Sequence, residues 1–120
     1  MKNMALGRVL AIVVSTLFIL SLPHMAFAHS PDKVEVFYDF KAQTLMVKIT
    51  HPSNNPDRHF VKEVTVKKNG AVVQQTAYTK QDGDVFTYSY KMPVKGEDVI
   101  EVTAVCSIQG SKTVKYQAGV

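Results

Sequence analysis

The sequence is poor in cysteine, with one residue, Cys106, among 120. A single thiol cannot close an internal disulfide, which excludes a disulfide-stabilised scaffold. The sequence also contains no internal repeat, low-complexity segment or interdomain linker. Helical periodicity is missing downstream of residue 28, which argues against a helical domain. Stability must therefore come from a small hydrophobic core without covalent staples.

A secretory signal peptide is expected at residues 1–28. Lys2 and Arg8 flank the start of an apolar run over residues 9–22, and the run is followed by Ala26-Phe27-Ala28. A basic start, an apolar middle and an A-x-A end are typical of a cleaved leader. The apolar run is short for a membrane span. We expect cleavage after Ala28, a periplasmic or secreted mature chain that begins at His29, and no stable membrane association after cleavage.

Excess positive charge is scarce once the leader is set aside. The chain has 14 Lys and Arg residues, and removing Lys2 and Arg8 leaves 12 against 10 acidic residues, a net charge of +2. Only Lys67 and Lys68 are adjacent, and no basic stripe is present. Nucleic-acid binding therefore has no support. Residues 29–120 are too few for more than one domain.

The mature region reads as all-β. Stretches in which apolar and polar residues alternate are separated by turn signals, and Asn69-Gly70 is a strong hairpin signal. The expected strands cover residues 34–40, 45–49, 60–68, 71–78, 85–91, 99–106 and 113–116. About seven short strands at this spacing predict an immunoglobulin-like antiparallel β-sandwich. Five aromatic residues are expected to pack in the sandwich: Tyr38, Phe40, Phe86, Tyr88 and Tyr90.

Candidate metal ligands fall near strand ends. His51 follows the second expected strand, His59 precedes the third, and Cys106 ends the sixth; His29 precedes the first. In a sandwich the loop after the second strand can lie beside the loop after the sixth, which would bring these side chains to one end. A buried core thiol at Cys106 and plain loop roles for the histidines are the alternatives.

Two motifs carry a family resemblance. His51-Pro52, a polar loop and His59-Phe60-Val61, together with the segment from Cys106 to Gly110, resemble the metal-site motifs of superoxide reductases, the desulfoferrodoxin and neelaredoxin family. The resemblance covers residues 34–116. It implies a mononuclear iron with His51 and His59 as equatorial ligands and Cys106 as the axial ligand.

The same resemblance assigns two further positions and an activity. His29 would stand for the first family histidine, whereas Gln109 occupies the position of the last one, so the site would be short of one imidazole. The implied reaction is one-electron reduction of superoxide to hydrogen peroxide, with an external electron donor. The rubredoxin-like cysteine cluster of some members is missing.

Two other classes of function remain open. The stretch from His59 to Val66 with Asn69-Gly70 also resembles the immunoglobulin-like subunit of the thiosulfate-oxidation carrier complex, which would make the domain a non-catalytic interaction module that needs no metal. A periplasmic copper carrier is the other alternative. A mature amino-terminal His29 offers its α-amine and its ring nitrogen, which could chelate Cu(II) with one further histidine.

Overall fold

The computed structural model describes residues 29–119, so the expected signal peptide at residues 1–28 lies outside the described residues. Seven strands form: β1 (Lys33–Asp39), β2 (Thr44–Thr50), β3 (Val61–Lys68), β4 (Ala71–Ala77), β5 (Val85–Lys91), β6 (Val99–Cys106) and β7 (Ser111–Gln117). Every expected strand is present, and its ends move by at most two residues. Within residues 29–119, no helix is long and apolar enough to cross a membrane.

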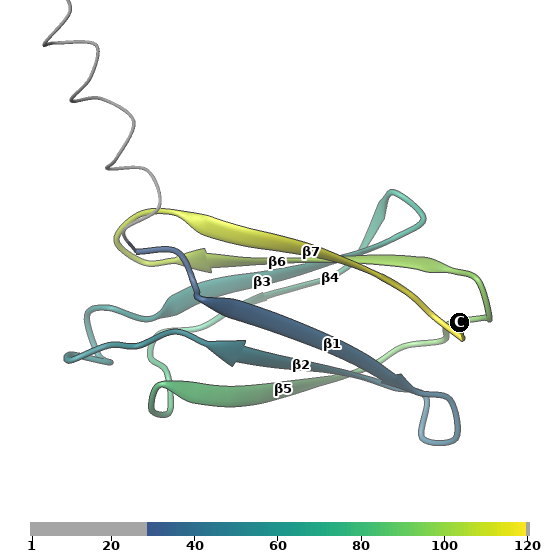
Figure 1. Cartoon of the computed structure of the whole chain (residues 1–120), viewed down its shortest axis with the longest axis horizontal. Helices are drawn as coiled ribbons and strands as arrows, with labels where there is room; N and C mark the ends of the chain where they lie inside the picture. The colour runs from purple at the N-terminus through teal and green to yellow at the C-terminus, as the bar shows by residue number, and fades with distance from the viewer. Residues whose placement is uncertain (1–28, 120) are drawn as a thin grey trace, which may run out of the picture.

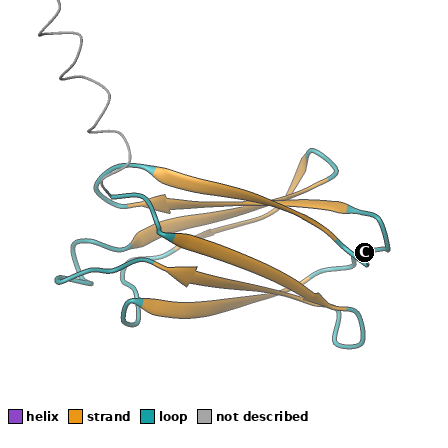
Figure 2. Ribbon diagram, viewed as in Figure 1, coloured by secondary structure: helices purple, strands orange, loops and turns teal. Residues whose placement is uncertain are grey.

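The strands form two antiparallel sheets stacked face to face (Figure 1). One sheet has the order β1-β2-β5 and the other has the order β4-β3-β6-β7. Only strands and loops make up the described part of the chain (Figure 2). The predicted all-β, immunoglobulin-like sandwich is therefore confirmed.

The core lies between the sheets because side chains alternate along each strand. In β2, Leu45, Val47 and Ile49 are fully buried, whereas Met46 and Lys48 between them are exposed. Alternate residues of β6 are buried in the same way: Ile100, Val102, Ala104 and Cys106. Full burial of one such aliphatic side chain contributes about 1.5–3 kcal/mol.

The predicted hairpin turn joins β3 to β4. Asn69 and Gly70 have φ values of 51° and 88°, the left-handed pair that a two-residue hairpin turn requires. The Asn69 side chain donates to Asp98 Oδ1 at 2.9 Å and accepts from the Val99 backbone N–H at 2.9 Å. The Lys95 backbone N–H, together with Asn69, lowers the pKa of Asp98. This turn therefore also fixes the start of β6.

Four of the five expected core aromatics are buried or partly buried, and Phe40 is not. Phe40 is 45% exposed, although its ring packs edge-on against Tyr38 with centroids 4.8 Å apart. Tyr88 stacks on Tyr78 at 4.0 Å, and the Tyr78 and Tyr90 hydroxyls are 2.7 Å apart. Burial, then Tyr78 and Asp82, raise the pKa of Tyr88 to about 12.

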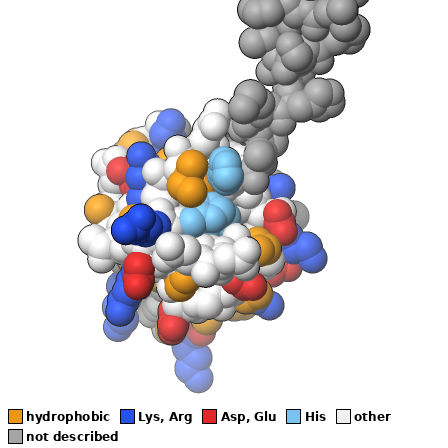
Figure 3. Space-filling view, turned by 90° about the vertical axis from the view of Figure 1, so that its left-hand side faces the viewer, with side chains coloured by type: hydrophobic (Ala, Val, Ile, Leu, Met, Phe, Trp, Pro, Cys, Tyr) orange, Lys and Arg blue, Asp and Glu red, His pale blue; other side chains and the backbone are white. Residues whose placement is uncertain are grey.

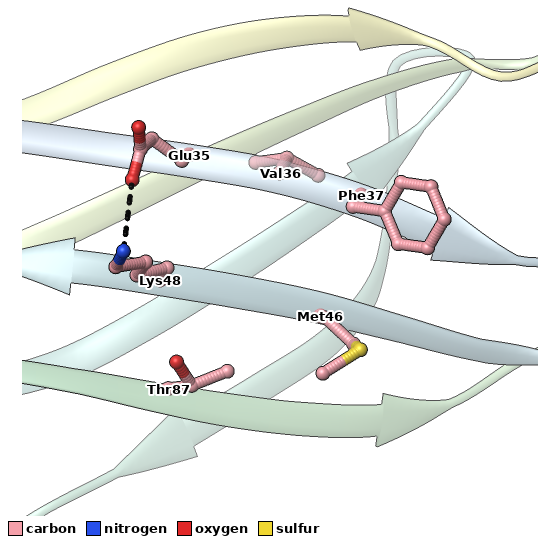
Figure 4. A pocket seen from close by; sticks show the side chains of 6 residues that line it. All are labelled: Glu35, Val36, Phe37, Met46, Lys48 and Thr87. Carbon is pink, nitrogen blue, oxygen red and sulfur yellow. Dashed lines mark ion pairs between the residues drawn. The ribbon is translucent and has the colours of Figure 1, made fainter.

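The outer face of the β1-β2-β5 sheet carries exposed apolar side chains. Phe37 and Met46 are cross-strand partners there and are 59% and 39% exposed. They line a shallow cavity of about 260 Å³ beside Glu35 and Lys48, whose charged atoms are 3.9 Å apart (Figure 4). Both charged side chains are more than half exposed, so this ion pair adds little stability.

Candidate metal centre

The loops at one end of the sandwich gather histidine side chains (Figure 3). His51 follows the last residue of β2 and is 1% exposed. Its backbone N–H donates to the Asp84 carbonyl at 2.8 Å, which continues the pairing of β2 with β5 beyond the strand end. The ring is thus held on the inner side of the sheet, at the end of the core.

Both ring nitrogens of His51 have close partners. Nδ1 lies 2.8 Å from the side-chain oxygen of Gln81, and Nε2 lies 2.8 Å from the His29 carbonyl oxygen. A metal can bind only a nitrogen with a free lone pair, so one of these two contacts must open for His51 to act as a ligand.

His59 reaches the same place through a β-bulge. Val61 pairs with Cys106 but Glu63 pairs with Val105, so β3 carries one extra residue, Lys62, against β6. The bulge returns Val61 to the buried face, although strict alternation from Val64 would place it outside. His59, two residues before Val61, approaches the His51 ring edge-on with centroids 4.7 Å apart.

The His59 ring contains an unsatisfied nitrogen. Among the described residues, Nε2 of His59 is buried and has no hydrogen-bond partner. Burial, followed by the nearby His51 and His29 rings, lowers the pKa of His59, so the neutral ring with one free lone pair is favoured. A metal ion or an ordered water would satisfy this buried nitrogen.

Cys106 ends β6 and is 2% exposed. Its sulfur accepts a hydrogen bond from the Ile108 backbone N–H at 3.4 Å, and its own N–H donates to the Gly110 carbonyl at 2.9 Å. Hydrogen bonds to a ligating sulfur tune the potential of the metal that it holds. The turn after β6 thus presents the sulfur in a fixed orientation.

Ser107 ties the histidine loop to the cysteine loop. Its hydroxyl accepts from the Phe60 N–H at 3.0 Å and donates to the Arg58 carbonyl at 2.9 Å. Its backbone N–H donates to the Phe60 carbonyl at 2.8 Å. These three bonds hold the two residues next to His59 against the residue that follows Cys106.

The three donors therefore converge. One ligand atom from each of His51, His59 and Cys106 lies within 4.8 Å of the other two. Three ligands spread evenly around one transition metal, at bond lengths near 2.1 Å to nitrogen and 2.3 Å to sulfur, lie about 3.6–3.8 Å apart. Side-chain shifts on the order of an ångström would bring all three donors onto one ion.

His29 and Gln109 are the two remaining candidates from the sequence. The His29 ring lies edge-on to His59 with centroids 5.3 Å apart. Both rings line an open cavity of about 420 Å³ with Pro52, Ser53, Asn54, Asn55 and Asp84. Gln109 is an exposed residue of the turn between β6 and β7. Its expected place beside the metal stays a prediction.

Gln81 is the site residue that sequence reasoning missed. It lies in the polar turn sequence Gln81-Asp82-Gly83-Asp84 before β5, yet it is 4% exposed and its side chain contacts His51 twice. A glutamine in a polar turn sequence carries no signal of burial. Only the folded loop shows that this residue turns inward.

Comparisons with known proteins return structural similarity alone. No protein-family model matches the sequence, and no curated protein matches it significantly. A variant of the superoxide reductase (neelaredoxin) from Ignicoccus hospitalis superposes with a TM-score of 0.48 at 16% identity, covering 74% of this chain and 77% of that one. The superoxide reductase from Nanoarchaeum equitans superposes with a TM-score of 0.44 at 13% identity, covering 74% and 91%. At this level of similarity the match adds nothing to the geometry of the site.

Proposed function

We propose that this protein is an exported, superoxide reductase-like protein that binds one iron through His51, His59 and Cys106. The observation that carries the proposal is the convergence of two imidazoles and one thiol within 4.8 Å, with the His59 Nε2 buried and unpartnered. Imidazole and thiolate together suit iron, copper and zinc far better than magnesium or calcium.

Bound ferrous iron would supply one electron, so that superoxide and two protons from solvent yield hydrogen peroxide, and an external donor would restore the electron. The chain's own residues supply the setting. The hydrogen bond from the Ile108 N–H stabilises negative charge on the Cys106 sulfur. Ser107 keeps the cysteine and histidine loops at a fixed separation. The cavity beside His59 leaves a path from solvent for a small ligand.

The test is anaerobic reconstitution of the mature chain with Fe(II). We expect one iron per chain, a thiolate-to-Fe(III) absorption band after oxidation, and consumption of superoxide. His51→Ala and His59→Ala should lose or weaken iron binding, and Arg58→Ala, an exposed change in the same loop, should not. Wild-type protein without stoichiometric metal would contradict the proposal and favour the interaction module.

A copper carrier is the second candidate, because a third imidazole is present. The His29 ring lies 5.3 Å from the His59 ring, on the open side of the site. Cleavage after Ala28 would add the α-amine of His29, and an amine with two imidazoles is a good donor set for Cu(II). Mass spectrometry of the exported chain tests the cleavage. Electron paramagnetic resonance of the Cu(II) form, with and without one residue added before His29, tests the amine.

A further inference from the structure

Gln81 contacts both the ring and the backbone of His51. Its side-chain nitrogen donates to the His51 carbonyl at 2.6 Å and to the Gly83 carbonyl at 3.0 Å. Its side-chain oxygen accepts the Val61 N–H at 3.1 Å and lies 2.8 Å from Nδ1 of His51. All four bonds come from one side chain in the loop between β4 and β5, and that side chain is 4% exposed.

These contacts fix which way the amide faces. The nitrogen must point at the two carbonyl oxygens, because carbonyls only accept, and the oxygen must point at the Val61 N–H, because that group only donates. The oxygen is therefore an acceptor in its contact with His51 as well. It follows that Nδ1 of His51 carries a hydrogen and donates it to Gln81.

We propose that Gln81 is a positioning residue for the metal site, which holds the hydrogen on Nδ1 of His51 and so makes Nε2 the nitrogen that binds metal. The inference rests on the proposed metal site. A ligating histidine commonly donates its other ring N–H to a fixed acceptor, which sets the ring orientation and makes the ligating nitrogen more basic. Gln81 fills this role from a strand-connecting loop that carries no ligand of its own.

The other ring nitrogen of His51 has one partner, at the same distance of 2.8 Å. Nε2 faces a single backbone carbonyl, that of His29, four residues before β1 begins. A carbonyl only accepts, so Nε2 donates in this contact, and metal must displace both the carbonyl and that hydrogen, whereas the contact of Nδ1 with Gln81 can stay. Nδ1 of His51 thus keeps its partner when metal binds, whereas Nε2 exchanges its partner for the metal.

Two substitutions separate positioning from support of the fold. Gln81→Leu removes all four hydrogen bonds. Gln81→Glu also loses the two donated bonds, but it keeps an oxygen that can accept from Nδ1 and from Val61. A structural role carried by the two donated bonds would make both variants lose metal equally. Asp82→Ala, an exposed change next in the chain, is the matched control.

The first measurement is ¹⁵N NMR of the His51 ring in the metal-free protein, assigned with a His51→Gln variant. We expect a hydrogen on Nδ1 in wild type, in Gln81→Glu and in Asp82→Ala, and loss of that preference in Gln81→Leu. The second measurement is Fe(II) affinity by anaerobic competition. Gln81→Leu should bind about 10- to 100-fold more weakly than wild type, and Gln81→Glu should stay within a few-fold of wild type.

Several outcomes would overturn the inference. One is an unprotonated Nδ1 in wild type. Another is equal Fe(II) affinity in wild type and Gln81→Leu, which would leave the proposed function intact. If wild type binds no metal, the proposed function fails and the NMR result alone decides the role of Gln81. If Gln81→Leu does not fold, a loss of the Nδ1 hydrogen or of iron in Gln81→Glu overturns the inference.

Discussion

Replacing His59 with leucine should move stability in opposite directions with and without metal. In the metal-free protein the substitution removes a buried nitrogen that has no partner among residues 29–119. An unsatisfied buried polar group costs about 1–3 kcal/mol, and leucine fills a similar volume. Allowing for imperfect packing, the metal-free variant should be more stable than wild type by about 1 kcal/mol. For a domain of this size that is a rise of about 4–8 °C in Tm.

Metal should reverse the order. At a free Fe(II) concentration of 100 times Kd, a ligand that binds only the folded state adds about 2.7 kcal/mol. The Tm of wild type should then rise by about 11–22 °C, whereas the variant should gain little. Anaerobic thermal unfolding of both proteins with and without Fe(II) gives all four values. Arg58→Leu, in the same loop but exposed, is the control and should respond to metal as wild type does.

The reasoning fails if wild type and His59→Leu keep the same order of Tm with and without Fe(II). A metal-free His59→Leu protein less stable than wild type, together with an equal Fe(II) increment in both, would make His59 an ordinary packing residue. His59 would then not be a metal ligand, and the proposed ligand set of His51, His59 and Cys106 would be wrong.

Three further predictions concern the same donors. The pKa of His59 is lowered below 6.5 in the folded state, so as the pH falls the unfolded chain takes up a proton on this residue before the folded chain does. The metal-free protein should therefore be most stable above pH 6.5 and should lose stability as the pH falls through the lowered pKa. Urea unfolding at several pH values checks this, and the free energy of unfolding of His59→Leu should depend less on pH. Cys106→Ser should abolish the thiolate-to-Fe(III) absorption while the far-ultraviolet circular dichroism stays that of a β-sandwich. Gln109→His should raise Fe(II) affinity about 10-fold or more by supplying the missing imidazole; an unchanged affinity would show that residue 109 does not reach the metal.

The sequence predicted the strands well because their signals are local. Asn69-Gly70 specifies its turn through the φ values that these two residues tolerate, and alternation along β2 and β6 follows directly from burial of one face. The strand order also allowed His51, His59 and Cys106 to meet at one end of the sandwich, and the structure brings them together.

What the sequence could not predict depends on contacts between distant segments. Counting by twos from Val64 and Val66 places Val61 and His59 on the outer face, and only the bulge opposite β6 reverses this. The inward turn of Gln81 depends on acceptors and donors from three separate segments: His51, Val61 and Gly83. The exposure of Phe40 depends on where β1 ends, because the ring lies one residue beyond the strand.

Because of the bulge in β3, deleting one particular residue of this strand would leave the site in place, whereas deleting another would not. Lys62 is the residue that β6 leaves without a counterpart. Deleting it would give β3 a regular register in which Val61 still faces Cys106 and His59 still points inward. Deleting Thr65, three residues later, would shift every upstream side chain to the opposite face and carry His59 away from the thiol. Length variation among homologous chains at position 62 is therefore compatible with convergence of His51, His59 and Cys106, whereas length variation inside the rest of the strand is not.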